Sequence, residues 1–190
     1  MAAATTLFLE RGYAGTTIPA IAERAGVALQ TVYRTAPGKA GLLAAAVRAA
    51  VAGGFGRSLR PVEERPAIRA VIDEPDPATQ LARYAHTQPG IWTRLGPLQR
   101  VLDAAASSDP ELRDLRDELD RERHRGLTRF TASLYERGAL RASLTAERAA
   151  DILVTVASSA TYDSLVTTHG WSDPEYESWL AETLQQCLLH

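Results

Sequence analysis

The sequence predicts an all-α protein in which a small N-terminal domain precedes a larger helical body. Hydrophobic residues make up 45% of its 190 residues, yet only three are Phe, and this composition suits closely packed helices better than a sheet. Apolar residues recur every three or four positions in most segments, and no segment alternates as a strand does. Four prolines between positions 61 and 77 interrupt this pattern and mark the expected connection between the two parts.

The first two predicted helices are short. Residues 2–11 form the first, which Gly12 ends. The second begins after Thr17, because a hydroxyl caps a helix whose first turn holds a proline, here Pro19, that needs no backbone donor. Gly26 can adopt the left-handed conformation that closes a helix, so the second helix is only about eight residues long.

A third short helix follows at once, over residues 29–35, and Pro37 ends it. Two short helices joined by a tight turn form a helix-turn-helix, whose second helix can enter the major groove of DNA. Val27 and Val32 are expected to hold the turn and the third helix to the core. The other side chains face either the groove or the solvent: Ala28, Leu29, Gln30, Thr31, Tyr33 and Arg34. The same spacing also fits two core-packing helices that bind nothing.

Residues 7–47 resemble the N-terminal domain of the TetR family of one-component repressors. The family's pattern is matched at its own spacing by Phe8, Gly12, Tyr13, Thr16, Thr17, Ile21, Ala22, Ala25, Gly26, Val27, Tyr33 and Lys39. One region departs from it, because the family has an aromatic residue where this chain has Ala36 and a small hydroxyl residue where it has Gly38. The departure predicts looser packing between the third helix and the next one.

Side-chain chemistry divides the DNA contacts of this motif into two groups. Gln30 can pair with adenine through two hydrogen bonds, Thr31 can reach thymine, and Arg34 can reach guanine or a phosphate. Ala28 and Leu29 add apolar contacts in the groove. The resemblance implies three contacts to the phosphate backbone, which set register without reading sequence: Thr17, Tyr33 and Lys39.

The next helix is predicted to run from residue 38 to about residue 60, and in the family it links the DNA-binding domain to the body. Three glycines near its end mark a bend or room for a ligand. We therefore assign residues 1–48 to the DNA-binding domain, with the linking helix continuing to about 60, and residues 61–190 to a ligand-binding and dimerisation domain. The body is expected to contain helices over residues 67–72, 78–105 with a break at 88–90, 110–137, 149–168 and 173–188.

The last two helices are expected to form a homodimer, since in the family they pair with their twins as a four-helix interface. Their apolar stripe is too large for a chain end to leave in water. The predicted interface residues are Ile152, Val156, Ala160, Trp179, Leu180, Leu184 and Leu188. In the family the body also surrounds a pocket for a small organic effector. Candidate pocket residues are Tyr84, His86, Trp92, Leu95, Gln99, Phe130, Tyr135 and Tyr162.

Charge and composition narrow the class of protein. Residues 1–60 have a net charge of +5 and residues 61–190 a net charge of −7, which fits a basic end that meets phosphates. The charge-dense segment 116–129 is explained by exposed ion pairs. A single Cys excludes an internal disulfide, and no apolar run is long enough for a membrane span, so we expect a cytoplasmic protein.

Together these features predict a homodimeric transcriptional regulator, a repressor that a small molecule releases from a palindromic operator in double-stranded DNA. The alternative is an all-α ligand- or partner-binding protein whose helix-turn-helix no longer reads DNA. The four His are scattered and no glycine-rich phosphate loop follows a strand. We therefore expect no catalytic residues, no cofactor and no metal.

Overall fold

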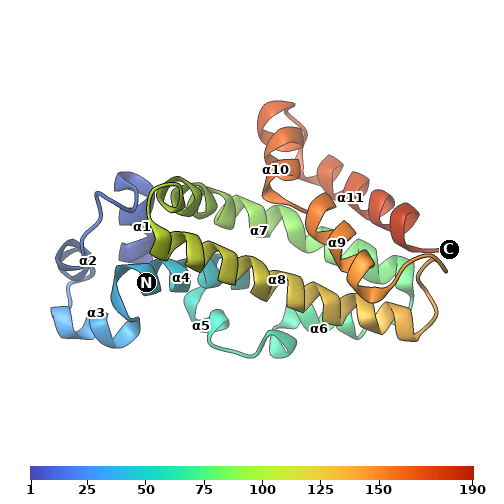
Figure 1. The fold of residues 1–190 in the computed structure, drawn as a ribbon, viewed down its shortest axis with the longest axis horizontal. Helices are drawn as coiled ribbons and strands as arrows, with labels where there is room; N and C mark the ends of the chain where they lie inside the picture. Colours follow the sequence, from blue (N-terminus) through green and yellow to red (C-terminus); the bar gives the residue numbers. More distant parts are fainter. The chain divides into compact units, whose positions relative to one another are not determined.

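The computed structural model describes residues 1–190, and the chain is helical with no β-strand (Figure 1). One isolated bridge joins Leu140 to Leu189. The all-α prediction is confirmed. The elements are α1 (Ala2–Arg11), α2 (Ile18–Ala25), α3 (Leu29–Thr35), α4 (Gly38–Ala52), α5 (Phe55–Ser58), the 3₁₀ turn η1 (Val62–Glu64), α6 (Pro66–Ile72), α7 (Pro77–Ala106), α8 (Pro110–Glu136), α9 (Ala146–Val156), α10 (Ser159–Tyr162), the wide π turn η2 (Asp163–Thr168) and α11 (Asp173–Leu188).

The helices pack into two compact units. The first unit comprises Met1–Arg60 and Thr93–Asp120, and the second comprises Pro61–Trp92 and Arg121–His190. Each of the two long helices, α7 and α8, therefore contributes one part to each unit. The functional division at residues 48 and 61 stays a prediction.

The start of the first unit forms as the sequence predicts. The Thr17 hydroxyl accepts a hydrogen bond from the Ala20 amide at 3.3 Å and caps α2. Gly26 closes this helix in the left-handed region, with φ at 65°. The prediction for Val27 is wrong, because its side chain is 41% exposed. Its backbone holds the turn instead, since the Val27 amide donates to the Ala22 carbonyl at 3.1 Å.

The linking helix is shorter than predicted. It ends at Ala52, because Gly53 and Gly54 have φ values of 74° and 147°, which break the helix. Both conformations favour glycine, since a Cβ atom would strain the backbone there. Only the four-residue helix α5 follows before the prolines, so the glycines form a turn rather than a bend.

Helix α7 is longer than predicted, and the expected break at residues 88–90 is wrong. It continues through Pro89 as one helix of 30 residues. A proline removes only one backbone donor, and α7 buries residues on both sides of this position. Leu81 and Ala85 lie before it and Trp92 after it, all 5% exposed or less. Burial along the helix therefore outweighs the one lost hydrogen bond.

The predicted helix 149–168 consists of three pieces. Helix α9 already begins at Ala146 under the cap of Thr145, and it ends before Ala157. Ser158 starts α10, because its hydroxyl accepts a hydrogen bond from the Thr161 amide at 3.2 Å. The final helix α11 agrees with the prediction, with a capping box formed by Ser172 and Glu175.

Candidate functional site

The outer face of α3 carries most of the predicted base contacts. Val32 faces the core at 5% exposed, and its neighbour Tyr33 is 53% exposed. Thr31 is half-buried and lies beside the core. The remaining predicted base or groove contacts are exposed: Ala28, Leu29, Gln30 and Arg34. The arrangement leaves polar side chains of α3 available to a ligand while the helix stays anchored through Val32.

Lys39 is positioned by contacts within its own chain. Its Nζ donates to the Tyr13 carbonyl at 2.9 Å and lies 4.1 Å from the centre of the Tyr13 ring. The ring in turn stacks on Phe8 at 6.0 Å. An ammonium group has three donors, so Lys39 keeps donors for a phosphate. Burial, helped by Glu111 and Asp109, raises the pKa of Tyr13 to about 12, which keeps its hydroxyl neutral.

The start of α4, beside Lys39, has no side-chain cap. The first backbone amides of a helix have no partner within the helix, and together with the helix dipole they favour an anion. Ala36 is buried at 7% exposed, and a Cβ atom added at Gly41 would lie 2.9 Å from Pro37 Cδ. The small residues thus let the turn pack closely, and the looser packing expected between α3 and α4 stays a prediction.

Two polar contacts fix α1 and α2. Thr16 is fully buried, and its hydroxyl lies 3.0 Å from the Leu7 carbonyl and 2.7 Å from that of Gly12. Arg24 forms a two-pronged ion pair with Glu10, at 2.7 and 3.0 Å. Thr16 belongs to the matched family pattern, and its structural role is to satisfy the turn that ends α1.

Four of the eight predicted pocket residues gather in the second unit. Tyr84 stacks on Phe130 with ring centres 5.8 Å apart, and Trp92 is buried at 5% exposed. The Tyr162 ring meets Tyr176 edge-on at 5.0 Å. These residues, which we call the aromatic cluster, come from α7, α8, α10 and α11.

The sequence did not predict two residues of this site: Tyr176, and Arg123, which we include in the aromatic cluster because it lies beside the rings. Arg123 lies in the segment read as exposed ion pairs, yet its guanidinium lies 5.3 Å from the centre of the Trp92 ring. Its Nη2 also donates to the Ala157 carbonyl at 2.7 Å, where α9 ends. The signal that could have found it is the break at Ser158, which frees that carbonyl.

The other predicted pocket residues do not join the cluster. Tyr135 is 56% exposed, and His86 is exposed and paired with Glu177 at 2.9 Å. Leu95 and Gln99 belong to the first unit. In the cluster, burial raises the pKa of Tyr84, and the nearby Arg123 opposes this increase.

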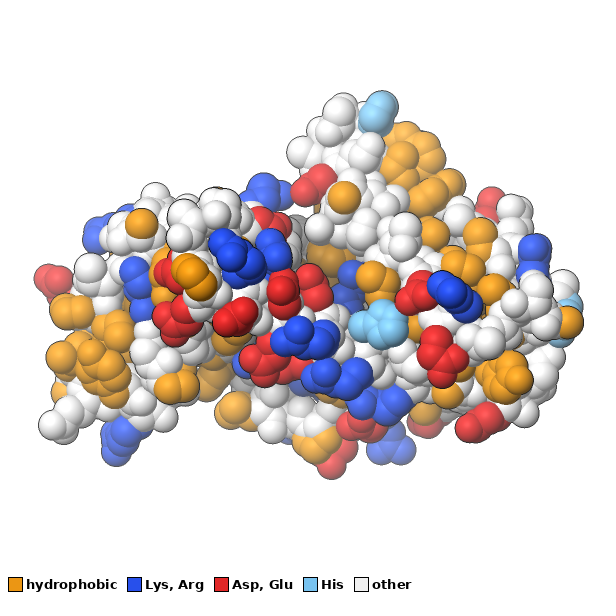
Figure 2. Space-filling model, viewed as in Figure 1, with side chains coloured by type: hydrophobic (Ala, Val, Ile, Leu, Met, Phe, Trp, Pro, Cys, Tyr) orange, Lys and Arg blue, Asp and Glu red, His pale blue; other side chains and the backbone are white.

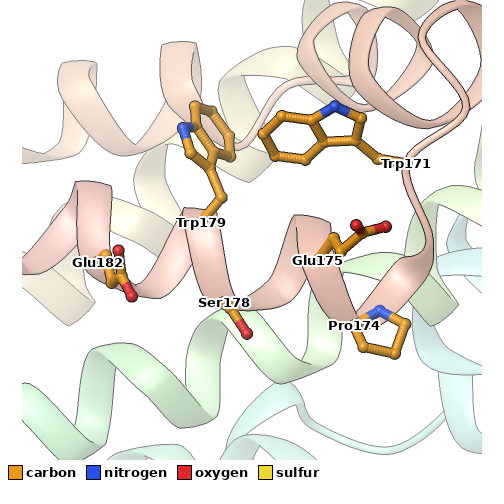
Figure 3. A pocket seen from close by; sticks show the side chains of 6 residues that line it. All are labelled: Trp171, Pro174, Glu175, Ser178, Trp179 and Glu182. Carbon is orange, nitrogen blue, oxygen red and sulfur yellow. The ribbon is translucent and has the colours of Figure 1, made fainter.

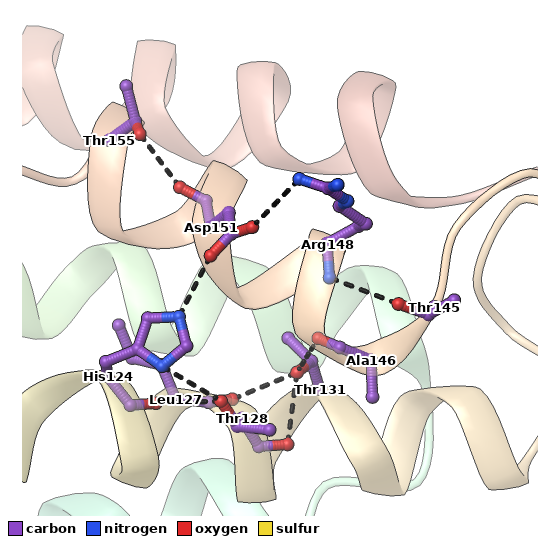
Figure 4. A network of polar contacts seen from close by, with 9 residues as sticks. All are labelled: His124, Leu127, Thr128, Thr131, Thr145, Ala146, Arg148, Asp151 and Thr155. Carbon is purple, nitrogen blue, oxygen red and sulfur yellow. Dashed lines mark hydrogen bonds and ion pairs between the residues drawn. The ribbon is translucent and has the colours of Figure 1, made fainter. Parts of the chain in front are cut away.

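A polar network holds α8 to α9 (Figure 4). His124 Nε2 lies 2.9 Å from Asp151, and the buried Thr131 hydroxyl donates to the Ala146 carbonyl at 2.6 Å. Arg148 lies 3.6 Å from the other Asp151 oxygen. Each of these polar groups has a partner on the other helix or on its own, so the network joins α8 to α9. No group of His, Cys, Asp and Glu side chains could hold a metal ion.

The predicted dimer stripe is largely buried within its own chain. Leu180, Leu184 and Leu188 are each 0% exposed. The argument that these side chains need a partner chain to keep them out of water is therefore wrong. The stripe packs inward because α11 contacts α9. Ile152 and Val156 are half-buried and Ala160 is exposed.

The outer face of α11 carries a shallow groove of about 480 Å³. Figure 3 shows Trp171 and Trp179 above it, and their rings meet edge-on with centres 6.2 Å apart. The rest of its lining is Pro174, Glu175, Ser178 and Glu182. This groove is the apolar surface that α11 offers to solvent.

On the face drawn in Figure 2, Arg, Asp and Glu side chains alternate along α8. The ion pairs are exposed, such as Arg129 with Glu63 at 3.8 Å. Exposed pairs add little stability. None of the helices combines the length and apolar character of a membrane span.

Comparison with known proteins agrees with this architecture. Residues 1–46 match the family model described as bacterial regulatory proteins, tetR family. No curated protein sequence matches the chain. Several solved structures share the fold over nearly the whole chain at low sequence identity.

One similar structure is the transcriptional regulator FadR from Bacillus subtilis in complex with stearoyl-CoA, with a TM-score of 0.71 and 18% identity, over 96% of this chain and 94% of that one. Another is NalD of Pseudomonas aeruginosa, the secondary repressor of the MexAB-OprM efflux pump, with a TM-score of 0.65 and 20% identity, over 100% and 94%. A third, assigned as a transcriptional regulator from Saccharomonospora viridis and bound to choline, has a TM-score of 0.69 and 19% identity, over 100% and 95%.

The helix-turn-helix followed by a helical body is thus an architecture that this chain shares with solved transcriptional regulators. Residues 1–46 match the tetR family model, and the chain as a whole has the fold of structures assigned to TetR-family regulators.

Proposed function

We propose that this protein is a transcriptional repressor that binds a palindromic operator as a homodimer and releases it when a small organic molecule enters the second unit. The observation that carries the proposal is the exposed face of α3, which offers Gln30 and Arg34, while Lys39 lies at the uncapped start of the next helix, α4. The same helical domain thus carries side chains that can read bases and groups that can bind phosphate, as DNA recognition requires.

The two groups of contacts have different roles. Gln30, Thr31 and Arg34 read base edges, with apolar contacts from Ala28 and Leu29. The phosphate contacts then come from the other three candidates, which position the helix on the backbone: Thr17, Tyr33 and Lys39. Lys39 is the best placed of these, because its contacts with Tyr13 fix the ammonium group and reduce the entropy that it loses on binding.

Binding sites selected from random DNA provide the test, with affinities measured by fluorescence anisotropy at two salt concentrations. Gln30→Ala should weaken operator binding by roughly 1–3 kcal/mol and relax the preference at one base pair per half-site. Lys39→Ala should weaken all sequences alike and lower the salt slope by about one. Thr6→Ala, in α1 and outside the motif, is the control and should change neither.

If Gln30→Ala and Lys39→Ala both leave affinity unchanged while the proteins stay folded, the helix-turn-helix is structural only. The better account would then be a ligand- or partner-binding protein whose helix-turn-helix no longer reads DNA.

The homodimer is proposed on the groove of α11 rather than on the buried leucines. Trp171 and Trp179 are the large apolar side chains at this surface, and a second copy would cover them. A two-fold dimer presents two copies of α3 about 34–36 Å apart or a small multiple of this distance, which fits a palindrome.

Trp179→Glu should convert a dimer of the 20.6 kDa chain to monomer in light scattering. Tyr135→Glu, at an exposed position of α8, is the control, and an unchanged mass for Trp179→Glu would reject this interface.

Release by a ligand requires that the ligand bind the two conformations of the protein with different affinity, typically by about 1–3 kcal/mol. The aromatic cluster is the proposed site, because it combines large apolar rings with buried polar groups. The ligands of the similar structures, stearoyl-CoA and choline, differ in charge. The class of ligand for this chain therefore has to be inferred from its own side chains.

A further inference from the structure

We propose that the effector carries a carboxylate or a similar organic anion, which Arg123, Trp92 and Tyr176 bind inside the second unit. The inference rests on the ligand-binding function proposed above and names the chemistry of that site. It follows from a surplus of hydrogen-bond donors and of positive charge in the aromatic cluster.

The first observation is a pair of buried polar groups without partners. Trp92 Nε1 and the Tyr176 hydroxyl are both buried and make no hydrogen bond. They are neighbours, since the approach of the Trp92 indole N–H to the Tyr176 hydroxyl lowers the pKa of that hydroxyl, although burial raises that pKa overall. An indole N–H can only donate, and the acceptor that the chain places beside it is the Tyr176 oxygen, which leaves the Tyr176 O–H without an acceptor. Buried polar groups in native proteins are nearly always paired, so this buried donor indicates a missing partner.

The second observation is the charge beside them. Arg123 lies over the Trp92 ring at 5.3 Å, and one of its N–H groups donates to the Ala157 carbonyl. It also reaches the Tyr84 hydroxyl, and none of its contacts is a carboxylate. Among the groups that shift the pKa of Tyr84 and of Tyr176, Arg123 is the only ionised one. Asp173 is engaged by Tyr162, whose hydroxyl donates to it at 2.8 Å.

An anion supplies what this cluster lacks. Each carboxylate oxygen can accept more than one hydrogen bond, and a planar guanidinium matches a carboxylate through two parallel bonds. A cationic ligand would be repelled by Arg123, and a neutral amide would leave its charge without a counterion. The stacked rings of Tyr84 and Phe130 offer an apolar surface for the rest of the molecule. The expected ligands are therefore aromatic or alkyl carboxylic acids.

Three probes of one shape and different charge test this inference: phenylacetate, phenylacetamide and 2-phenylethylammonium. Calorimetric titration of the full chain should give the tightest binding for phenylacetate, by about tenfold or more over the amide. Arg123→Gln should reduce phenylacetate binding to the level of the amide. Arg129→Gln, an exposed arginine on the same helix, is the matched control and should retain the preference.

A second variant keeps the test valid if Arg123→Gln does not fold. Tyr176→Phe removes only a hydroxyl without a partner, so the protein should stay folded and bind phenylacetate severalfold more weakly. Equal binding of the acid and the amide, tightest binding of the ammonium probe, or no binding of any probe would overturn the inference, and water would then be the partner of the buried groups. DNA affinity with and without bound phenylacetate is measured separately. If phenylacetate binds as expected but DNA affinity does not change, the anion site stands and the proposed release mechanism fails.

Discussion

A buried hydroxyl is hydrogen-bonded in the N-terminal helices of this chain, whereas buried polar groups in the second unit lack partners. In the N-terminal helices, the fully buried Thr16 hydroxyl is within hydrogen-bond distance of two carbonyls. In the second unit, the fully buried Tyr176 hydroxyl has no partner, and neither has the Trp92 indole beside it. A buried group left unpaired costs about 1–3 kcal/mol. The difference fits the anion site proposed above: the buried hydroxyl of the N-terminal helices is paired within the chain, whereas the aromatic cluster has buried groups that a bound molecule would pair.

Among the variants that test this comparison, Thr16→Val should change the free energy of unfolding most. Valine keeps the shape of threonine and removes the hydroxyl, so the turn after α1 loses its buried hydrogen bond. We expect the free energy of unfolding to fall by about 1–3 kcal/mol in urea denaturation. Thr16→Ser, which keeps the hydroxyl, should retain more of the stability than Thr16→Val. If the valine variant is as stable as the original protein, the hydrogen bond does not hold the N-terminal helices together.

The opposite result is expected in the second unit. Tyr176→Phe removes a hydroxyl that has no partner, so the free energy of unfolding should stay the same or rise by up to about 1 kcal/mol. Tyr162→Phe is the matched control, because its hydroxyl donates to Asp173 at 2.8 Å and its loss should cost about 0.5–1.5 kcal/mol. Equal losses for the two variants in urea denaturation would mean that both hydroxyls are satisfied, and the contrast between the units would disappear.

The two regions also differ in how well the sequence predicted them. The N-terminal motif depends on local signals: Thr17 caps α2, Gly26 ends it, and Val32 anchors α3. Each signal acts within a few residues, so its spacing is visible in the chain. The failures there were also local, because the exposed side chain of Val27 and the break at Gly53 depend on how the backbone turns after a glycine.

The aromatic cluster depends on contacts between distant residues, and sequence spacing says little about these. Tyr84 and Phe130 were predicted because they are aromatic residues on helices that surround a pocket in the family. Arg123 was missed, since a charged residue in a charged segment is usually exposed, and here a carbonyl at the end of α9 and the Trp92 ring draw it inward. The argument for the dimer stripe failed for the same reason, because a pattern shows that leucines are buried but not whether their own chain or a partner buries them; the dimer itself stays a prediction.

The smallest expected effect concerns how the helices begin in the two regions. In the second unit, Ser172 donates to Glu175 through both its amide, at 2.8 Å, and its hydroxyl, at 2.7 Å. These bonds from the Ser172 side chain and backbone lower the pKa of Glu175 below its usual value. In the first unit, α2 is capped by the Thr17 hydroxyl, which does not titrate at these pH values, and α4 has no side-chain cap. Of these three helix starts, only that of α11 should therefore respond to acid through its cap.

Because the pKa of Glu175 is lower in the folded chain, its charged form stabilises the fold above the usual glutamate pKa of about 4.3. This contribution is lost as the pH falls through the lowered value. Glu175→Gln keeps the side-chain length and removes the charge, so the variant should be less stable than the original protein at pH 7. The difference should shrink as the pH falls through the lowered pKa of Glu175, below which both side chains are neutral. The free energy of unfolding of both proteins is measured by urea denaturation across this range. The other carboxylates titrate equally in the two proteins, so their contributions cancel in the difference. Curves that stay parallel down to the lowest pH at which the proteins fold would show that Glu175 caps α11 without its charge, and the start of α11 would then not differ from those of α2 and α4 in its response to acid.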